Sequence, residues 1–286
     1  MADLSFLQQQ GTVAAIDRAH EAARRDRGRL GLSQAGHRCP RLLWYRHRGL
    51  PETPPEGRVL RLFALGEAIE RLVIGDLSMA GCQVYHQQRE VEFKVDLPPA
   101  GEIRLVGHID GIVRGLKEAP ERPHLLECKS ANRKKFDELV KLSDYRAWNE
   151  VYWWQVQFYM LGLKLKRAAV FVYCKDDSRV YMERIRADHE AAGDRLSWVF
   201  VEIASPVEPE RVCPRADNWE AKWCPYHDRC WGLAPVFAPL APARAGERVG
   251  VRGDALASGD RVPPTPGPSP HACGAEGGEK KVEVMW

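Results

Sequence analysis

Two short segments constrain this chain more than any other feature. They are Gly107-His108-Ile109-Asp110-Gly111 and Leu125-Leu126-Glu127-Cys128-Lys129, and seventeen positions separate Asp110 from Glu127. Both have the aliphatic composition of strands, in which side chains alternate, so Glu127 and Lys129 should point to one face and Cys128 to the other. Two converging acids suit a hard divalent cation, and a neighbouring lysine can stabilise negative charge on a phosphate. This is the minimum equipment for metal-assisted phosphodiester hydrolysis.

Taken alone, Glu127 and Lys129 are also typical of a solvated cross-strand pair, so further residues must support a site. Glu70 lies in the predicted helix 58–80. Its neighbours on one face of that helix are expected to be Phe63, Gly66, Val73 and Leu77. An ionised carboxylate on an apolar face is costly unless it is compensated, and a metal or a nearby arginine would serve equally for Glu70.

A predicted helix over 151–165 carries polar side chains on one face. Gln155 and Tyr159 are four residues apart and therefore share that face, which Tyr152 joins one turn earlier. An amide and two phenols suit contact with the catalytic acids or with a nucleic-acid strand. A polar helix face beside solvent is the alternative.

The order of the predicted elements indicates an α/β protein. We expect helices over 5–27, 38–48, 58–80, 133–145, 151–165 and 187–203, and strands over 84–97, 102–113, 123–130, 168–174 and 180–186. The predicted architecture is a central mixed β-sheet flanked by helices, with the acids on adjacent strands.

Four regions are expected along the chain. The helical region 1–57 carries the first cysteine, 58–210 forms the core, and 211–237 is a cysteine-bearing segment. Residues 238–286 are rich in Ala, Gly, Pro, Arg and Asp and lack apolar periodicity. Such a segment cannot bury enough surface to offset the entropy of ordering, so we expect this tail to be disordered and dispensable.

The sequence resembles the PD-(D/E)XK nucleases, in particular the RecB-like and Cas4-like exonuclease branch with its phage-type versions. Four motifs carry the resemblance, which covers roughly residues 30–231: Gly66-Glu67-Ala68-Ile69-Glu70, Gly107-His108-Ile109-Asp110, Glu127-Cys128-Lys129 and Gln155-x-x-x-Tyr159. They occur in the family's order. The resemblance implies a restriction-endonuclease-like core and a metal-dependent DNA nuclease.

The resemblance also implies a role for each motif residue. Asp110 and Glu127 would be ligands of Mg²⁺ or Mn²⁺, with the Cys128 carbonyl as a candidate third ligand. Lys129 would be catalytic, while Gln155 and Tyr159 would place the substrate and support the site. Many RecB-like members carry histidine where this chain has Glu70; glutamate is still an oxygen ligand suited to Mg²⁺.

Four cysteines have the one-plus-three layout of Cas4-like and AddB-like nucleases, which hold a [4Fe–4S] cluster. They are Cys39, Cys213, Cys224 and Cys230. The family's usual cysteine before the last pair is replaced by Ala221, so Cys213 would have to substitute through a longer loop. Thiolates suit iron–sulfur clusters and zinc alike, so zinc completed by His37 or His227, or unligated thiols, remain alternatives to the cluster.

Bulk properties limit the partners. The chain has 42 Lys and Arg against 39 Asp and Glu, a net charge of +3, so nucleic-acid binding would require local basic patches. No run of about 18 apolar residues predicts a membrane helix, and the N-terminus has no secretory pattern. We therefore expect a cytoplasmic protein with reduced or metal-bound cysteines.

Aromatic and basic residues alternate in two regions and suit stacking on bases with phosphate contacts. The aromatics are Trp44, Tyr45, Trp148, Tyr152, Trp153 and Trp154, and the bases near them are Arg38, Arg41, Arg46, Arg48, Lys134, Lys135 and Arg146. Placement of these aromatics in the core is the alternative.

These observations favour a divalent-metal-dependent DNA nuclease, an exonuclease on single strands or DNA ends. Its setting would be recombination, repair or CRISPR adaptation, with a recombination or helicase partner. A structure-selective endonuclease on the same core and a non-catalytic DNA-binding subunit are the rivals. A binding module has no need to gather acids near phosphates, which argues against the second.

Overall fold

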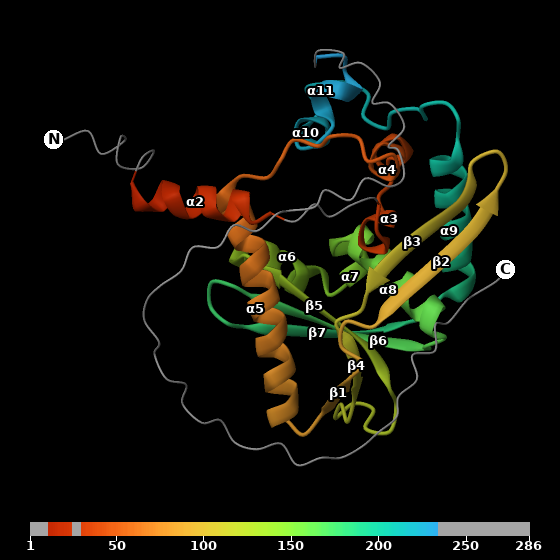
Figure 1. Cartoon of the computed structure of the whole chain (residues 1–286). Coiled ribbons are helices and arrows are strands. Elements are labelled where there is room, and N and C mark those ends of the chain that lie inside the picture. Colours follow the sequence, from red (N-terminus) through yellow and green to blue (C-terminus); the bar gives the residue numbers. More distant parts are fainter. Residues whose placement is uncertain (1–10, 25–29, 234–286) are drawn as a thin grey trace, which may run out of the picture. The chain divides into compact units, whose positions relative to one another are not determined.

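The computed structural model describes residues 11–24 and 30–233. The expected tail at 238–286, and the ends of the predicted helix 5–27, lie outside these residues. In order, the elements are α2 (Thr12–Ala22), α3 (Leu32–Ala35), α4 (Pro40–His47), α5 (Gly57–Met79), β1 (Gln83–Tyr85), β2 (Glu90–Leu97), β3 (Gly101–His108), β4 (Gly111–Arg114), β5 (His124–Ala131), α6 (Arg133–Leu142), α7 (Tyr145–Trp148), α8 (Glu150–Leu163), β6 (Arg167–Cys174), β7 (Val180–Arg186), α9 (His189–Ala204), α10 (Trp219–Lys222) and α11 (His227–Cys230) (Figure 1).

A five-stranded mixed sheet forms the centre, in the order β1-β4-β5-β6-β7. Strands β5 and β6 are parallel, whereas the pairs β1–β4, β4–β5 and β6–β7 are antiparallel. Strands β2 and β3 form a separate antiparallel hairpin. The predicted α/β class with a mixed sheet flanked by helices is confirmed.

The two predicted strands 84–97 and 102–113 are wrong as continuous elements. Each is divided between the two sheets, because β1 and β4 belong to the central sheet and β2 and β3 to the hairpin. Backbone hydrogen bonds fix the crossing: Gln88 N donates to Ile109 O at 2.9 Å, and Ile109 N donates to Arg89 O at 3.1 Å.

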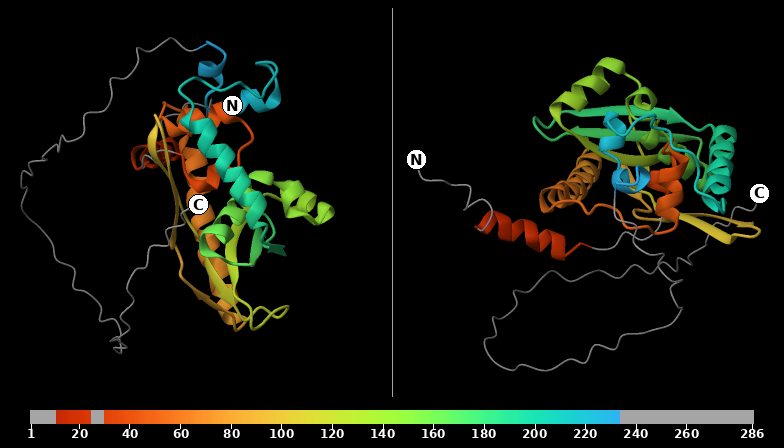
Figure 2. Two further views of the ribbon diagram at one scale, coloured as in Figure 1. Left: turned by 90° about the vertical axis from the view of Figure 1, so that its right-hand side faces the viewer. Right: turned by 90° about the horizontal axis from the view of Figure 1, so that it is seen from above.

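Alternating side chains of the central strands pack against helices on opposite faces of the sheet. On β5, Leu125 joins the core formed with α8, whereas Leu126 joins the core formed with Ile69, Val73 and Leu77 of α5. Figures 1 and 2 show α5 on one side of the sheet. This two-sided burial explains why β5 has two consecutive apolar residues, Leu125 and Leu126, next to its first residue.

The helix predicted over 133–145 ends at Leu142, and a second helix begins at Tyr145. Helix α6 is capped by Asn132, whose side chain accepts a hydrogen bond from Lys135 N, and it ends where Ser143 adopts a left-handed φ of 50°. Asp144 then caps the four-residue helix α7. The turn directs Tyr145, which is completely buried, into the core.

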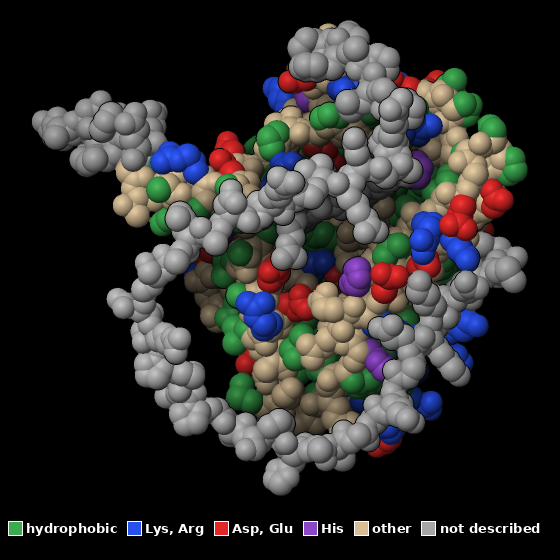
Figure 3. All heavy atoms as spheres, in the orientation of Figure 1, with side chains coloured by type: hydrophobic (Ala, Val, Ile, Leu, Met, Phe, Trp, Pro, Cys, Tyr) green, Lys and Arg blue, Asp and Glu red, His purple; other side chains and the backbone are tan. Residues whose placement is uncertain are grey.

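The cysteine-bearing segment packs against the N-terminal part of the chain. The rings of Tyr45 and Tyr226 lie 5.0 Å apart, and Thr53 N donates to Pro225 O at 3.3 Å. Arg38 forms an ion pair with Glu220. Acidic and basic side chains are interspersed on the face shown in Figure 3, in keeping with the small net charge. Among the described helices, none has both the length and the apolar character needed to span a bilayer.

Candidate active site

Strand β5 presents Glu127 and Lys129 on the face covered by α8, as its alternation predicts. Lys129 Nζ donates to Glu127 Oε1, and Gln155 Nε2 of α8 donates to the same oxygen at 2.9 Å. The Glu127 side chain is wholly buried, while that of Lys129 is 20% exposed. The second carboxylate oxygen, Glu127 Oε2, is buried without a hydrogen-bond partner in the described part of the chain. Such an oxygen is costly unless a ligand binds it.

Asp110 lies in the link between β3 and β4, not within a strand as predicted. Strand β4 pairs with β5 at three positions, and the pair furthest along β5 is Gly111 with Leu126. Beyond that point β5 has a free edge, and Asp110 Oδ2 accepts a hydrogen bond from the Cys128 N–H at 2.7 Å. The N–H and C=O of a strand residue point to the same edge, so the Cys128 carbonyl also faces the Asp110 side.

Glu70 lies one residue beyond the buried Ile69 on α5. It is half-buried and accepts a hydrogen bond from Gln88 Nε2 at 3.0 Å. The predicted apolar face around it is only partly correct, because Val73 is buried whereas Phe63 is 40% exposed. Among the described residues no arginine pairs with Glu70, and the Gln88 amide contacts the carboxylate instead. A metal at Glu70 stays a prediction.

Tyr159 and Gln155 support Glu127 from α8. Tyr159 is buried and hydrogen bonds to Gln155. Its hydroxyl occupies the space beside Gly107, where a Cβ would lie only 2.6 Å from the phenol oxygen. Gly107 therefore leaves room for the phenol. The Lys129 ammonium lies 4.9 Å from the ring centroid of Tyr152, at a distance suited to a cation–π contact.

Tyr145 is a site residue that the sequence motifs do not reveal. Its hydroxyl is buried, has no hydrogen-bond partner among the described residues, and lies within electrostatic range of Lys129 and Glu127. The turn at Ser143 places it there. The only signal in the sequence is the capping residue Asp144, which could have marked the start of a second helix.

The three acids form one electrostatic unit. Burial raises the pKa of Glu127 to about 8; Lys129 opposes this rise and Asp110 adds to it. Burial also raises the pKa of Asp110, although the positive charge of Lys129 opposes the rise. The pKa of Glu70 is raised mainly by burial and, to a smaller extent, by the negative charge of Asp110. Burial acts to lower the pKa of Lys129, but its acidic neighbours hold the pKa well above its ordinary value.

These donors have the chemistry of a Mg²⁺ or Mn²⁺ site, since hard cations prefer carboxylate and carbonyl oxygens. The partnerless Glu127 Oε2 and the mutual repulsion of the acids would both be relieved by a cation. Within residues 11–24 and 30–233, however, no group of three or more Asp, Glu, His or Cys side chains is already arranged around one point. Binding would therefore require the carboxylates to adjust.

The four cysteines of the predicted cluster lie on two segments that the fold brings together. Arg41 Nη1 donates to Cys230 Sγ at 3.8 Å. Burial raises the pKa of Cys213 and of Cys224, and negative charge on Cys39 and Cys230 contributes to both shifts. The thiols thus share one region, but the described residues contain no preformed cysteine metal site.

Of the two histidines that could complete a zinc site, His227 has partners at both ring nitrogens and His37 at one. His227 Nδ1 lies 2.9 Å from Asp228 Oδ1, and its Nε2 lies 3.2 Å from Ala216 O. His37 Nδ1 accepts a hydrogen bond from Cys39 N at 3.0 Å. In this arrangement neither ring nitrogen of His227 is available to a metal.

Two of the aromatics expected to stack on bases belong to the core. Tyr45 is 3% exposed and donates its hydroxyl proton to Glu208, and Trp153 is 9% exposed. Trp148, Tyr152 and Trp154 keep partial exposure, and the Arg146 guanidinium lies 4.3 Å from the Trp153 ring centroid. The aromatic–basic surface is therefore smaller than the sequence pattern suggests.

Comparison with known proteins gives a family match. A family model described as the PD-(D/E)XK nuclease superfamily matches residues 17–231. No curated protein sequence matches significantly. The crystal structure of SSO0001 aligns with a TM-score of 0.45 and 13% identity, covering 78% of this chain and 95% of that one. An alkaline exonuclease (LHK-Exo) from Laribacter hongkongensis aligns with a TM-score of 0.41 and 17% identity, covering 65% and 91%. Its complex with dAMP aligns with a TM-score of 0.39 and 16% identity, covering 67% and 89%.

Proposed function

Because the chain belongs to the PD-(D/E)XK nuclease superfamily, we propose that it is a divalent-metal-dependent deoxyribonuclease, an exonuclease that acts on single strands or DNA ends. One observation carries the proposal. Asp110, Glu127 and Lys129 meet where β5 loses its pairing with β4, and the buried Glu127 Oε2 has no partner among the described residues. A binding surface for DNA would not place buried acids beside phosphates.

Asp110, Glu127 and the Cys128 carbonyl would hold Mg²⁺ or Mn²⁺, with Glu70 at the other side of the site. When bound, the cation supplies Lewis acidity to a water molecule and to the scissile phosphate. The Lys129 ammonium orients the attacking water and stabilises the charge that develops on the phosphoryl oxygens. Gln155 holds Glu127 Oε1, which leaves Oε2 for the cation, and Tyr159 fixes the Gln155 amide.

The mode of cleavage is tested with matched linear and circular single-stranded DNA in Mn²⁺. An obligate exonuclease degrades the linear strand and leaves the circle intact. Cutting of both forms at similar rates would contradict the exonuclease proposal and favour the structure-selective endonuclease. Binding of both forms without any cleavage would favour the non-catalytic subunit.

The raised pKa values of the acids predict how metal stabilises the protein at different pH. A buried carboxyl with a raised pKa keeps its proton in the folded state to a higher pH than in the unfolded chain. For Glu127 the stabilising contribution is complete below its ordinary pKa of 4.5 and is lost as the pH rises to about 8. A cation replaces that proton, so the increase in Tm caused by Mn²⁺ should be larger near pH 8 than near pH 5.

Thermal unfolding with Mn²⁺ or with EDTA across this pH range measures the effect. The variant Glu127→Gln serves as the control, because its amide does not titrate and its metal-dependent gain should be small throughout. An equal gain in the wild type at every pH would contradict the linkage between protons and metal.

We further propose that Cys39, Cys213, Cys224 and Cys230 hold a [4Fe–4S] cluster. The shared location of the thiols supports this, and the two partners of His227 argue against a zinc site that uses its ring. The cluster would join the segment before α4 to the C-terminal segment, with Cys213 replacing the cysteine absent at Ala221.

Anaerobic purification is expected to yield a brown protein with stoichiometric iron and sulfide. Cys213→Ser should lower the iron content and the Tm, whereas Cys82→Ser, at a buried cysteine near Gly115 outside this region, should not change the iron content. A colourless protein containing stoichiometric zinc would overturn the cluster assignment.

A further inference from the structure

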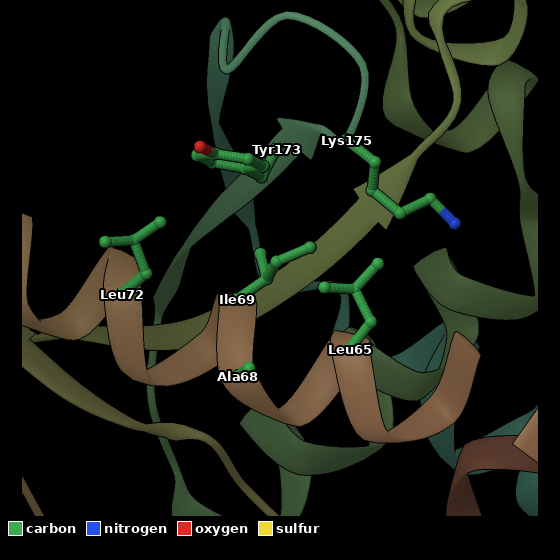
Figure 4. Close-up of a pocket in the computed structure, with 6 residues that line it drawn as sticks. All are labelled: Leu65, Ala68, Ile69, Leu72, Tyr173 and Lys175. Atoms are coloured by element: carbon green, nitrogen blue, oxygen red, sulfur yellow. The ribbon is translucent and has the colours of Figure 1, made fainter. Parts of the chain in front are cut away.

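An open groove lies between α5 and the C-terminal end of β6, outside the acid and lysine site. Its volume is about 260 Å³, and it is lined by Leu65, Ala68, Ile69, Leu72, Tyr173 and Lys175 (Figure 4). Figure 4 shows the α5 side chains Leu65, Ile69 and Leu72 on the side of the helix that faces Tyr173; Lys175 lies in the turn after β6. We call this the α5–β6 groove.

The α5–β6 groove adjoins the catalytic elements on two sides. In the parallel β5–β6 ladder, Tyr173 lies opposite Ser130, the residue after Lys129. On the helix side, the groove residue Ile69 immediately precedes Glu70. Tyr173 packs with Cys128 on the α5 face of the sheet, so the groove lies on the side of the helix that carries Glu70, while Glu127 and Lys129 lie on the other face.

The groove combines an apolar floor, an aromatic ring and a cation. Leu65 and Leu72 are 43% and 46% exposed, although both are large apolar residues. Tyr173 and Lys175 are partly exposed. No ion pair joins Lys175 to another described residue, whereas the neighbouring acids are engaged: Asp176 accepts from Arg133 N at 2.7 Å, and Asp177 pairs with Arg179 at 2.8 Å. The ammonium thus remains available to a phosphate.

We propose that the α5–β6 groove binds one unstacked nucleobase of a single DNA strand, with Tyr173 stacking on the base and Lys175 contacting the adjacent phosphate. This inference rests on the proposed nuclease function. Base–aromatic stacking and lysine–phosphate contacts are how proteins bind single strands without reading sequence. The groove would thereby select a strand whose bases are unpaired next to the cleavage site.

Size and charge favour a base over a protein segment as the occupant. Ligand pockets commonly measure about 300–1,000 Å³, so a groove of about 260 Å³ suits one planar ring. A second hollow further along α5 is lined by Val73, Asp76, Leu77, Ala80, Phe171 and Val180. Its charged residue is an acid, which would repel a phosphate, so the proposed subsite is confined to the end that carries Lys175.

The test measures binding of labelled single-stranded DNA to the full-length protein in EDTA, where metal-dependent cleavage does not occur. Abasic nucleotides are introduced one position at a time. In the wild type, one position should weaken binding about 5- to 150-fold, the range that corresponds to loss of one base–aromatic stack. Tyr173→Ala should lose the same affinity for intact DNA and show no further loss at that position. Tyr173→Phe, which keeps the ring, should bind like the wild type.

Lys175→Ala should reduce the slope of log affinity against log salt by about 0.7, the value for one phosphate contact with a single strand. Lys117→Ala is the matched control, because Lys117 is an exposed lysine in the link between β4 and β5, at the other end of β5. It should leave the slope unchanged.

The subsite is overturned if Tyr173→Ala binds intact DNA like the wild type, or if every abasic position has the same effect in both proteins. A concentration-dependent dimer that Leu72→Glu abolishes would assign the groove to a second copy and would also overturn it. Cleavage of the same DNA by the wild type in Mn²⁺ separates the two hypotheses. If cleavage occurs while the binding test fails, only the subsite is wrong; if neither cleavage nor binding occurs, the proposed function fails as well.

Discussion

Replacing Asp110 with asparagine is expected to reduce DNA cleavage by about 10³-fold or more, because a bound cation supplies several kcal/mol of charge stabilisation and each ~1.4 kcal/mol is a factor of ten in rate. Asparagine keeps an oxygen that can accept the Cys128 N–H, so the link between β3 and β4 should retain its conformation. The loss should therefore arise from weaker metal binding and not from unfolding.

Calorimetric titration with Mn²⁺ measures the metal affinity of Asp110→Asn, and single-turnover kinetics measure its cleavage rate. In metal-free buffer near pH 8 its Tm should equal or exceed that of the wild type, since the substitution removes a carboxylate that raises the pKa of Glu127. A variant that binds Mn²⁺ with unchanged affinity and retains cleavage would show that Asp110 is not a ligand. Asp176→Asn is the matched control, because Asp176 is an exposed acid whose partner is Arg133 N.

The second large effect is expected for Lys129→Met. Removal of a group that stabilises transition-state charge costs about 10²–10³-fold in kcat. The same change leaves the Glu127 carboxylate buried without the Lys129 ammonium. Breaking a buried ion pair by removing one partner lowers the free energy of unfolding by about 3–5 kcal/mol. Lys129 opposes the raised pKa of Glu127, so without it Glu127 should take up a proton more readily.

The stability loss in Lys129→Met should accordingly be largest near pH 8 and smaller near pH 5, where Glu127 is protonated. The double variant Glu127→Gln/Lys129→Met should recover stability while remaining inactive, which separates folding from chemistry. Recovery of cleavage in the double variant, or wild-type kcat in Lys129→Met, would refute the role of Lys129.

The local geometry of the site follows from sequence periodicity, but its assembly does not. Alternation along one strand correctly places Glu127 and Lys129 together, and a four-residue spacing correctly places Gln155 and Tyr159 on one helix face. These relations depend only on neighbours within one element.

Asp110 shows where sequence reasoning reaches its limit. The segment 102–113 alternates like one strand, yet the chain crosses between two sheets near Ile109, held by hydrogen bonds to Gln88 and Arg89. Nothing local marks that crossing, because the partners are twenty residues away. Tyr145 was missed for a related reason: a left-handed turn at Ser143, a residue type that does not favour it, directs the ring into the site.

Burial of aromatics is equally a tertiary property. Arginines stand near Tyr45 and Trp153 in the sequence, a pattern typical of nucleic-acid-binding surfaces. In the structure both rings are nevertheless buried in the same hydrophobic core. Tyr173 and Lys175, in contrast, stand in an ordinary strand-to-turn sequence. Only the packing of α5 against β6 turns them into the wall of a groove.

The most direct test is digestion of end-labelled linear DNA by purified wild-type protein with Mg²⁺ or Mn²⁺, beside Lys129→Ala and an EDTA control. We predict metal-dependent degradation by the wild type, abolished by EDTA and reduced about 10²–10³-fold by the substitution. If the metal-replete wild type leaves single-stranded and double-stranded DNA intact, or if Lys129→Ala cuts as fast as the wild type, then the site on β5 is not a nuclease centre.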